Sequence, residues 1–128
     1  MRIGIVDFKD TPHGDTLARA AWDAGLAPEA ICWLAPSREL PAALREAPDL
    51  AALAVPVGLR GATPLSRVTR AWMKAFEDLQ ARGVPVFVST RPGRPNLLAS
   101  VATPIPDQAG TSASVGAVLA AIRAARMT

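Results

Sequence analysis

Short apolar segments alternate with helical segments along the whole chain, and this alternation constrains the fold more than any other feature. The apolar segments are rich in strand-forming residues and end at polar or proline-containing turns, as buried strands do. We expect four strands, at residues 2–8, 30–34, 50–57 and 84–88. Because Pro85 lacks an amide hydrogen, it has to lie at the entrance of the fourth strand or where no ladder bond forms.

Between these strands, apolar residues recur at three- and four-residue intervals, as they do on one face of a helix. Thr63 and Pro64 mark the clearest helix start, because threonine caps exposed amides and proline needs no amide partner at the first position. Gly25 and Gly83 follow two of these segments and supply the left-handed residue that ends a helix. We expect helices at residues 15–24, 41–46, 64–82 and 111–127. Residues 90–110 are proline-rich and predict neither state.

Strands that are joined by helices pair in parallel through right-handed crossovers, and strands that are apolar on both sides need helices on both faces. We therefore expect one α/β domain over residues 1–128, a three-layer α/β/α sandwich with a four-stranded parallel sheet. A chain of 128 residues, half of them apolar, supports one core rather than two. In such sheets ligands bind beyond the carboxyl ends of the strands. Functional residues are expected in the loops at 7–10, 36–39, 57–63 and 89–94.

The charge pattern limits the classes of partner that this chain could bind, and the single cysteine indicates the cellular compartment. The net charge is +3, but the arginines are scattered among acidic neighbours, so we expect no nucleic-acid partner. Every apolar run is interrupted before the roughly 20 residues that span a bilayer, so we expect no membrane segment. Cys32 allows no internal disulfide and the chain opens without a signal-peptide pattern, which together predict a cytoplasmic protein. Cys32 has no nearby histidine or basic partner and is expected to be a core thiol.

The glycine-containing segment after the third predicted strand is the most informative loop. It runs Val57-Gly58-Leu59-Arg60-Gly61-Ala62-Thr63 and leads directly into a helix start. Amides near Ala62 and Thr63, the helix dipole and the Arg60 side chain suit a phosphate without a metal. A tight turn made by the two glycines is the alternative interpretation, and the spacing alone does not separate the two.

Residues 48–63 as a whole resemble the third strand and phosphate loop of lumazine synthases. Other segments follow in family order. Residues 3–10 are similar to the first strand and its Phe-Asn turn, residues 36–41 resemble the Pro-Gly-x-x-Glu-x-Pro turn, residues 83–87 match the fourth strand, and residues 115–122 resemble the last helix. The match spans nearly the whole chain and implies a flavodoxin-like sheet of the lumazine synthase type.

The resemblance implies an enzyme of riboflavin biosynthesis. It would condense 5-amino-6-(ribitylamino)uracil with 3,4-dihydroxy-2-butanone 4-phosphate, losing phosphate and water, to give 6,7-dimethyl-8-ribityllumazine. No cofactor and no metal are implied, and catalysis would rest chiefly on holding two small-molecule substrates together. The family also implies a homo-oligomer, here a pentamer or decamer rather than a closed shell, because the chain starts at its first predicted strand.

Residue by residue, the resemblance gives the candidate site its roles. Phe8 would stack on the pyrimidine ring, and Glu39 with the backbone of Ser37 and Arg38 would hold the ribityl hydroxyls. An adjacent subunit would contribute Phe87. Backbone contacts to the ring are assigned to Val57, Gly58 and Leu59, and phosphate binding to Arg60, Gly61, Ala62 and Thr63.

The chain also departs from the family pattern. Leu65 stands near the position of the family's proton-transferring histidine, and Asp107 and Val115 lie nearest the positions of its phosphate-binding arginine and lysine. His13, on the same predicted sheet edge, is the candidate catalytic residue in place of the missing one, with a solvated side chain as the alternative. Three functions therefore stay open: the synthase, a catalytically impaired flavin- or lumazine-binding oligomer, and a condensing enzyme for a related phosphorylated substrate.

The tryptophans are expected chiefly in the core. Trp72 lies on the main apolar stripe of its predicted helix, and Trp33 points to the opposite face from Cys32. Trp22 is left as a candidate subunit contact.

Overall fold

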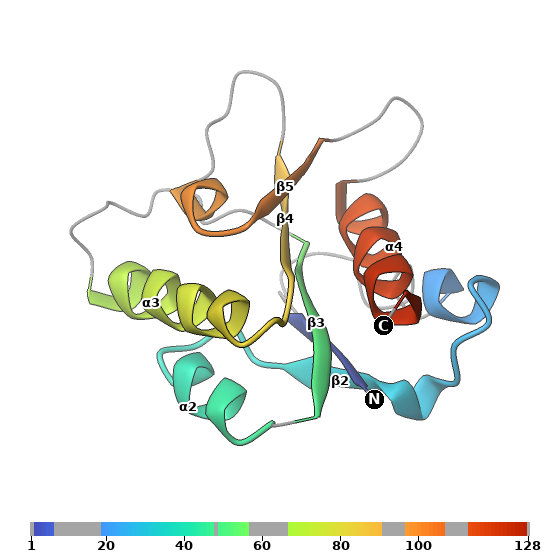
Figure 1. Ribbon diagram of the computed structural model, residues 1–128, viewed down its shortest axis with the longest axis horizontal. Coiled ribbons are helices and arrows are strands. Elements are labelled where there is room, and N and C mark those ends of the chain that lie inside the picture. The colour runs from blue at the N-terminus through green and yellow to red at the C-terminus, as the bar shows by residue number, and fades with distance from the viewer. Residues whose placement is uncertain are drawn as a thin grey trace.

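Five parallel strands form one sheet in the computed structural model, with helices on both faces (Figure 1). The structure describes residues 2–6, 19–47, 49–56, 67–90, 97–106 and 113–127. Across the sheet the strands run in the order β2-β1-β3-β4-β5. Their bounds are β1 Arg2–Val6, β2 Ile31–Leu34, β3 Leu50–Val55, β4 Val86–Thr90 and β5 Thr103–Pro106.

The helices divide between the two faces of the sheet. We call the side covered by α2, α3 and η2 the α3 face, and the side covered by α4 and the helical residues 19–23 the α4 face. The helical bounds are η1 Pro28–Ala30, α2 Leu40–Arg45, α3 Arg67–Ala81, η2 Leu97–Ser100 and α4 Ala113–Arg126. Gly25 and Gly83 have φ of 83° and 84°, so both adopt the left-handed conformation expected after a helix.

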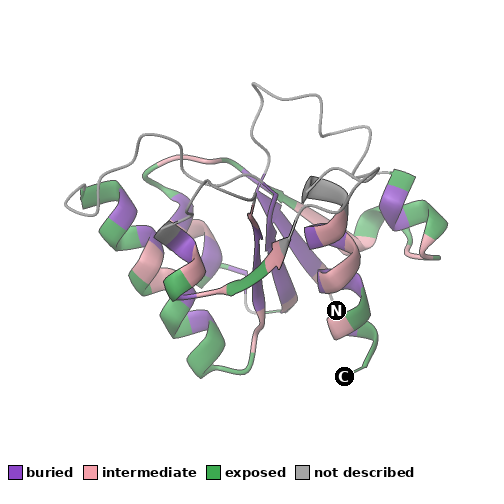
Figure 2. Cartoon of the chain, turned by 90° about the horizontal axis from the view of Figure 1, so that it is seen from above, coloured by how far each residue is buried: buried purple, intermediate pink, exposed green. Residues whose placement is uncertain are grey.

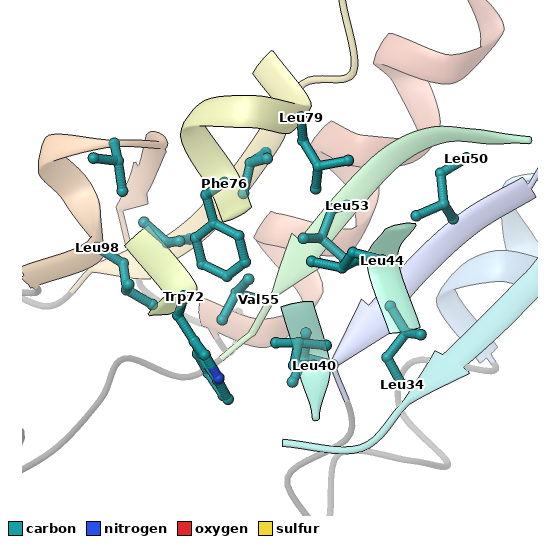
Figure 3. Close-up of a cluster of buried hydrophobic side chains, with 14 of the residues drawn as sticks. Leu34, Leu40, Leu44, Leu50, Leu53, Val55, Trp72, Phe76, Leu79 and Leu98 are labelled. Atoms are coloured by element: carbon teal, nitrogen blue, oxygen red, sulfur yellow. The ribbon is translucent and has the colours of Figure 1, made fainter. Parts of the chain in front are cut away.

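The larger side chains gather on the α3 face. Phe76 is fully buried and points from α3 toward Leu53 and Val55 of β3 (Figure 3). Leucines of α2 and η2 close the cluster from both sides, because α2 places Leu40 and Leu44 one turn apart on its inner side. This cluster fixes α3 and α2 on the sheet.

Small side chains bring α4 close to the other face. Alanines of β3 meet alanines of α4, and all of them are buried. Figure 2 shows the central strands of the sheet coloured as buried between the helices. The alanines concerned are Ala52, Ala54, Ala117, Ala121 and Ala125. Gly116 continues this pattern, because a Cβ there would lie only 3.2 Å from the Ile105 side chain of β5. The small residues of the last helix thus explain its tight packing.

The sheet has a fifth strand where the sequence predicts four. Strand β5 lies within the range that predicts neither helix nor strand, because Pro104 and Pro106 weaken its strand signal. At the edge of a sheet these prolines are tolerated, since they stand two residues apart and both nitrogens can face away from β4. The expectation of a four-stranded sheet is therefore wrong in strand number, whereas the α/β class and the parallel pairing are confirmed.

Strand β4 begins two residues later than predicted. Val84 and Pro85 precede it, and the Pro85 carbonyl accepts a hydrogen bond from the Leu53 amide at 2.9 Å. Pro85 therefore lies at the entrance of the strand, where its missing amide costs no ladder bond, as the sequence predicts.

An ion pair joins the start of β1 to the turn before β3. Arg2 donates from Nε and Nη2 to the Asp49 carboxylate at 2.6 and 2.8 Å, and both side chains are partly exposed. Hydrogen bonding to the Arg2 guanidinium holds the pKa of the Asp49 carboxyl below its usual value of 3.8. The stability gained from the pair is therefore complete above that usual value and is lost as the pH falls through the lowered pKa of the folded state.

We expect Asp49→Asn to lower the stability modestly near neutral pH and to match the wild type in strong acid. Urea unfolding of both proteins across the acidic range measures this difference. Asp78→Asn, on the exposed side of α3, is the matched control. A difference between wild type and Asp49→Asn that stays constant with pH would contradict the account.

Candidate functional site

The carboxyl ends of the strands meet along one edge of the sheet. Val6 of β1 pairs with Leu34 of β2, and Ile5 pairs with Ala54 of β3, so β1, β2 and β3 end at the same height. Strand β4 continues two residues beyond Val88, the partner of Val55, at the same edge. Because every pairing is parallel, the segments that follow the strands all begin at this edge. The sequence predicts its candidate site in these segments.

The described helices that next follow β1 and β3 in the sequence pack on opposite faces of the sheet. After β1 the next described helical residues, 19–23, pack on the α4 face through Ala20 and Ala21. After β3 the next described helix is α3, which packs on the α3 face. Neighbouring strands whose connections diverge in this way leave a crevice beyond their carboxyl ends, which is where ligands bind in open α/β sheets. The carboxyl ends of β1 and β3 are therefore where this class of sheet would be expected to hold a ligand.

Most of the predicted site residues lie outside the described residues. These are Phe8, His13, Val57, Gly58, Leu59, Arg60, Gly61, Ala62 and Thr63, and their assigned roles stay predictions. The described residues that flank them are Val6 at the end of β1, Val55 and the buried Pro56 at the end of β3, and Arg67 at the start of α3.

The turn at residues 37–39, directly after β2, is the described part of the candidate site. The Glu39 amide donates to Ser37 Oγ at 3.2 Å, and the Leu40 amide donates to the Ser37 carbonyl at 3.1 Å. The Ser37 amide in turn donates to the Ala35 carbonyl at 3.0 Å. These local bonds fold the chain sharply from β2 into α2.

Trp72 of α3 anchors this turn from the core. Its Nε1–H donates to the Ser37 carbonyl at 3.0 Å, and its indole is 2% exposed. A buried indole N–H needs an acceptor, and here the acceptor belongs to the turn that carries Glu39. The sequence predicts Trp72 in the core, which is confirmed, but gives no sign of this bond. The sequence implies only that a buried indole N–H needs some acceptor, and it does not identify which group that is.

Glu39 presents a carboxylate at the carboxyl edge of the sheet. Its backbone stands at the start of α2, but its side chain makes no capping hydrogen bond and is exposed. Within the described part of the chain, the carboxylate has no hydrogen-bond or ion-pair partner. An ionised carboxylate accepts several hydrogen bonds, so this group suits the hydroxyls of a polyol.

Phe87 lies in the core of its own chain. It is 9% exposed, sits three residues before the end of β4, and packs in the cluster under α4. Its predicted contact with a ligand in a neighbouring subunit stays a prediction.

The remaining candidate residues divide between core and surface. Cys32 is half-buried and packs against the cluster of the α3 face, so the thiol expected in the core lies at its margin. Trp33 is 44% exposed, so its expected place in the core is wrong, because β2 is an edge strand. Trp22 is 56% exposed. No three His, Cys, Asp or Glu residues in the described ranges gather to hold a metal ion, and no helix there is long and apolar enough to cross a membrane.

Comparison with protein-family models, curated proteins and solved structures finds no match to this chain. In its described residues the chain is an α/β protein with an all-parallel five-stranded sheet, and the turn that carries Arg38 and Glu39 lies at the carboxyl edge of that sheet. The resemblance to lumazine synthases rests on the sequence motifs alone.

Proposed function

We propose that this protein binds a ribityl-substituted pyrimidine at the carboxyl edge of its sheet and condenses it with a phosphorylated ketone, as lumazine synthases do. The observation that carries the proposal is the Ser37–Glu39 turn. It follows β2, which pairs with β1, and it presents a carboxylate without a described partner at the edge where ligands bind in this class.

The strand order supports the same position for the ligand. An order of β2-β1-β3-β4-β5 is the flavodoxin-like order, in which the ligand lies beyond the ends of β1 and β3. Glu39 lies one strand away from this point, at a suitable place for the ribityl chain. Phe8, which follows β1, would stack on the ring, and the loop from Arg60 to Thr63, which follows β3, would hold the phosphate.

The proposed chemistry needs positioning more than an acid or a base. An amine of the pyrimidine adds to the ketone carbonyl and loses one water to give an imine, elimination releases phosphate, and ring closure with loss of a second water gives the lumazine. Holding both reactants in place supplies much of the rate, and amides with Arg60 steady the departing phosphate. His13 would exchange the protons. The neighbour's Phe87 would complete the site in a pentamer or decamer.

The synthase reaction is tested by mixing the purified protein with both substrates and following lumazine absorbance. We expect product above the uncatalysed background, and we expect Phe8→Ala to reduce it strongly. Glu39→Gln should raise the KM for the pyrimidine by about 10- to 100-fold, because a charged acceptor for hydroxyls is lost. Glu46→Gln, at the other end of α2, is the matched control and should behave as wild type. Product at the background rate would contradict the synthase assignment.

A ligand-binding function without catalysis is the second candidate. It is favoured by Leu65, which stands near the position of the family's histidine. In that case lumazine or riboflavin still binds when both substrates give no product, and Glu39→Gln weakens that binding. Turnover with another phosphorylated ketone in place of the second substrate would favour the related condensing enzyme instead.

A further inference from the structure

The backbone of the turn that carries Glu39 is held at three points. Before Glu39, the Ser37 carbonyl accepts a hydrogen bond from the Trp72 indole N–H at 3.0 Å. After it, Leu40 is 1% exposed and packs in the cluster of the α3 face. Between them, the Glu39 amide donates to Ser37 Oγ at 3.2 Å. The backbone of Glu39 is therefore fixed, although its side chain is exposed.

The bond from Trp72 differs from the other hydrogen bonds of this turn because it comes from a distant part of the chain. The Ser37 amide donates to the Ala35 carbonyl and the Leu40 amide to the Ser37 carbonyl, both over two or three residues. The indole of Trp72 reaches the turn across 35 positions of sequence. Local bonds define the shape of a turn, whereas a bond to another element defines where the turn lies relative to the sheet.

The indole that makes this bond is itself held firmly in the core. Its ring centroid lies 6.2 Å from that of Phe76, which packs against β3 in the same cluster. The close packing of a protein interior leaves such a ring little room to move. Figure 3 shows the indole on the same side of the cluster as Leu40, the first residue of α2. A stiff connection therefore runs from the sheet through α3 to the turn.

We infer that Trp72 is a positioning residue for the ribityl chain of the ligand, an inference that rests on the proposed function. The indole is buried and acts through the turn, which it holds where the Glu39 carboxylate meets the ribityl hydroxyls. A carboxylate displaced by about 1 Å loses good hydrogen-bond geometry, and a loosened turn has to be ordered again when the ligand binds. The bond from Trp72 therefore sets the affinity for the hydroxylated chain rather than for the pyrimidine ring.

Two ligands that share one ring system separate this role from general packing. 6,7-Dimethyl-8-ribityllumazine carries the hydroxyls, and 6,7,8-trimethyllumazine has a methyl group in their place. Trp72→Phe keeps most of the apolar volume and loses the donor to Ser37. It should raise the Kd for the ribityl compound about tenfold and leave the Kd for the trimethyl compound unchanged. A variant that merely loosened the core would weaken the binding of both ligands alike.

The experiment is a fluorescence titration of the full chain with each lumazine, for the wild type, Trp72→Phe, Glu39→Gln and the double variant. Because Trp72 acts through Glu39, the double variant should bind the ribityl compound no more weakly than Glu39→Gln alone. Leu79→Ala is the control, since Leu79 is buried in the same cluster about two turns further along α3. It should lower the stability of the protein and leave both Kd values as in the wild type.

A second measurement uses the wild type alone and does not depend on how well any variant folds. Hydrogen exchange of the Trp72 indole N–H is followed by its ¹H–¹⁵N signal, with the exposed Trp22 and Trp33 as internal controls. A ligand that holds the turn also holds the acceptor of this N–H in place. The ribityl compound should therefore slow the exchange about tenfold, and the trimethyl compound should leave it unchanged.

The outcomes separate this inference from the proposed function. A wild type that binds neither lumazine contradicts the proposed function and, with it, the role of Trp72. When the wild type binds the ribityl compound, the inference alone is overturned if Trp72→Phe leaves that Kd unchanged or weakens both ligands equally. It is also overturned by losses that add in the double variant, or by an indole exchange rate that the ribityl compound does not change.

Discussion

Trp72→Ala is expected to lower the free energy of unfolding by about 3–5 kcal/mol, among the largest effects of any single substitution in this chain. The indole is 2% exposed and packs beside Phe76, with ring centroids 6.2 Å apart and the planes inclined by 50°. Its removal leaves a cavity between α3 and the turn after β2. It also leaves the Ser37 carbonyl without its indole donor.

Trp72→Phe separates the two contributions. It keeps most of the apolar volume and loses the hydrogen bond to Ser37. The lost bond is expected to lower the free energy of unfolding by about 1 kcal/mol, in addition to the cost of replacing the indole with a smaller ring. Urea unfolding of both variants measures the costs. A Trp72→Ala protein within about 1 kcal/mol of wild type would contradict the core packing described above.

Gly4→Val is expected to destabilise the protein by about 3 kcal/mol, and Gly4→Ala by about 1 kcal/mol. Strand β1 lies between β2 and β3, and Gly4 faces leucines from three neighbouring positions. A Cβ at Gly4 would lie 3.0 Å from a methyl group of Leu53, 3.1 Å from one of Leu34 and 3.2 Å from one of Leu50. Alanine needs only small leucine movements, whereas the branches of valine require the sheet or α2 to shift.

Thermal or urea unfolding of the two Gly4 variants measures how the loss of stability depends on the size of the side chain at this position. The cost has to rise from alanine to valine, because volume rather than backbone conformation limits this position. A valine variant as stable as the wild type would show that the leucines have free space around them.

Much of the fold follows from the local pattern of the sequence. The apolar stripe predicted for the helix correctly places Trp72, Phe76 and Leu79 in the core, because a helix covered by a sheet needs one apolar side. Val68, predicted on the same stripe, is 39% exposed, so the stripe is wrong in the first turn of α3. Strand alternation places Trp33 on the opposite face from Cys32, which agrees with the packing of Ile31 on the α4 face. Alternation does not reveal that β2 is an edge strand, and therefore the exposure of Trp33 was not predicted.

The fifth strand shows the other limit of local pattern. Proline disfavours strands in general, but the penalty vanishes on the outer side of an edge strand, and only the complete sheet decides which strand is at the edge. In the candidate site, the sequence finds the turn at 37–39 through the motif around Glu39. The bond from Trp72 to that turn joins residues 35 positions apart, so no local signal predicts it.

The central claim is that a ribityl-pyrimidine binds at the carboxyl edge of the sheet. Titration of the ¹⁵N-labelled protein with 6,7-dimethyl-8-ribityllumazine, followed by amide chemical shifts, tests it most directly. The account predicts shifts at the amides of Ser37, Glu39 and Thr90, at the carboxyl ends of β2 and β4, and none at Arg82 and Gly83 at the amino edge. Saturating lumazine that moves only amino-edge amides, or none at all, would contradict it.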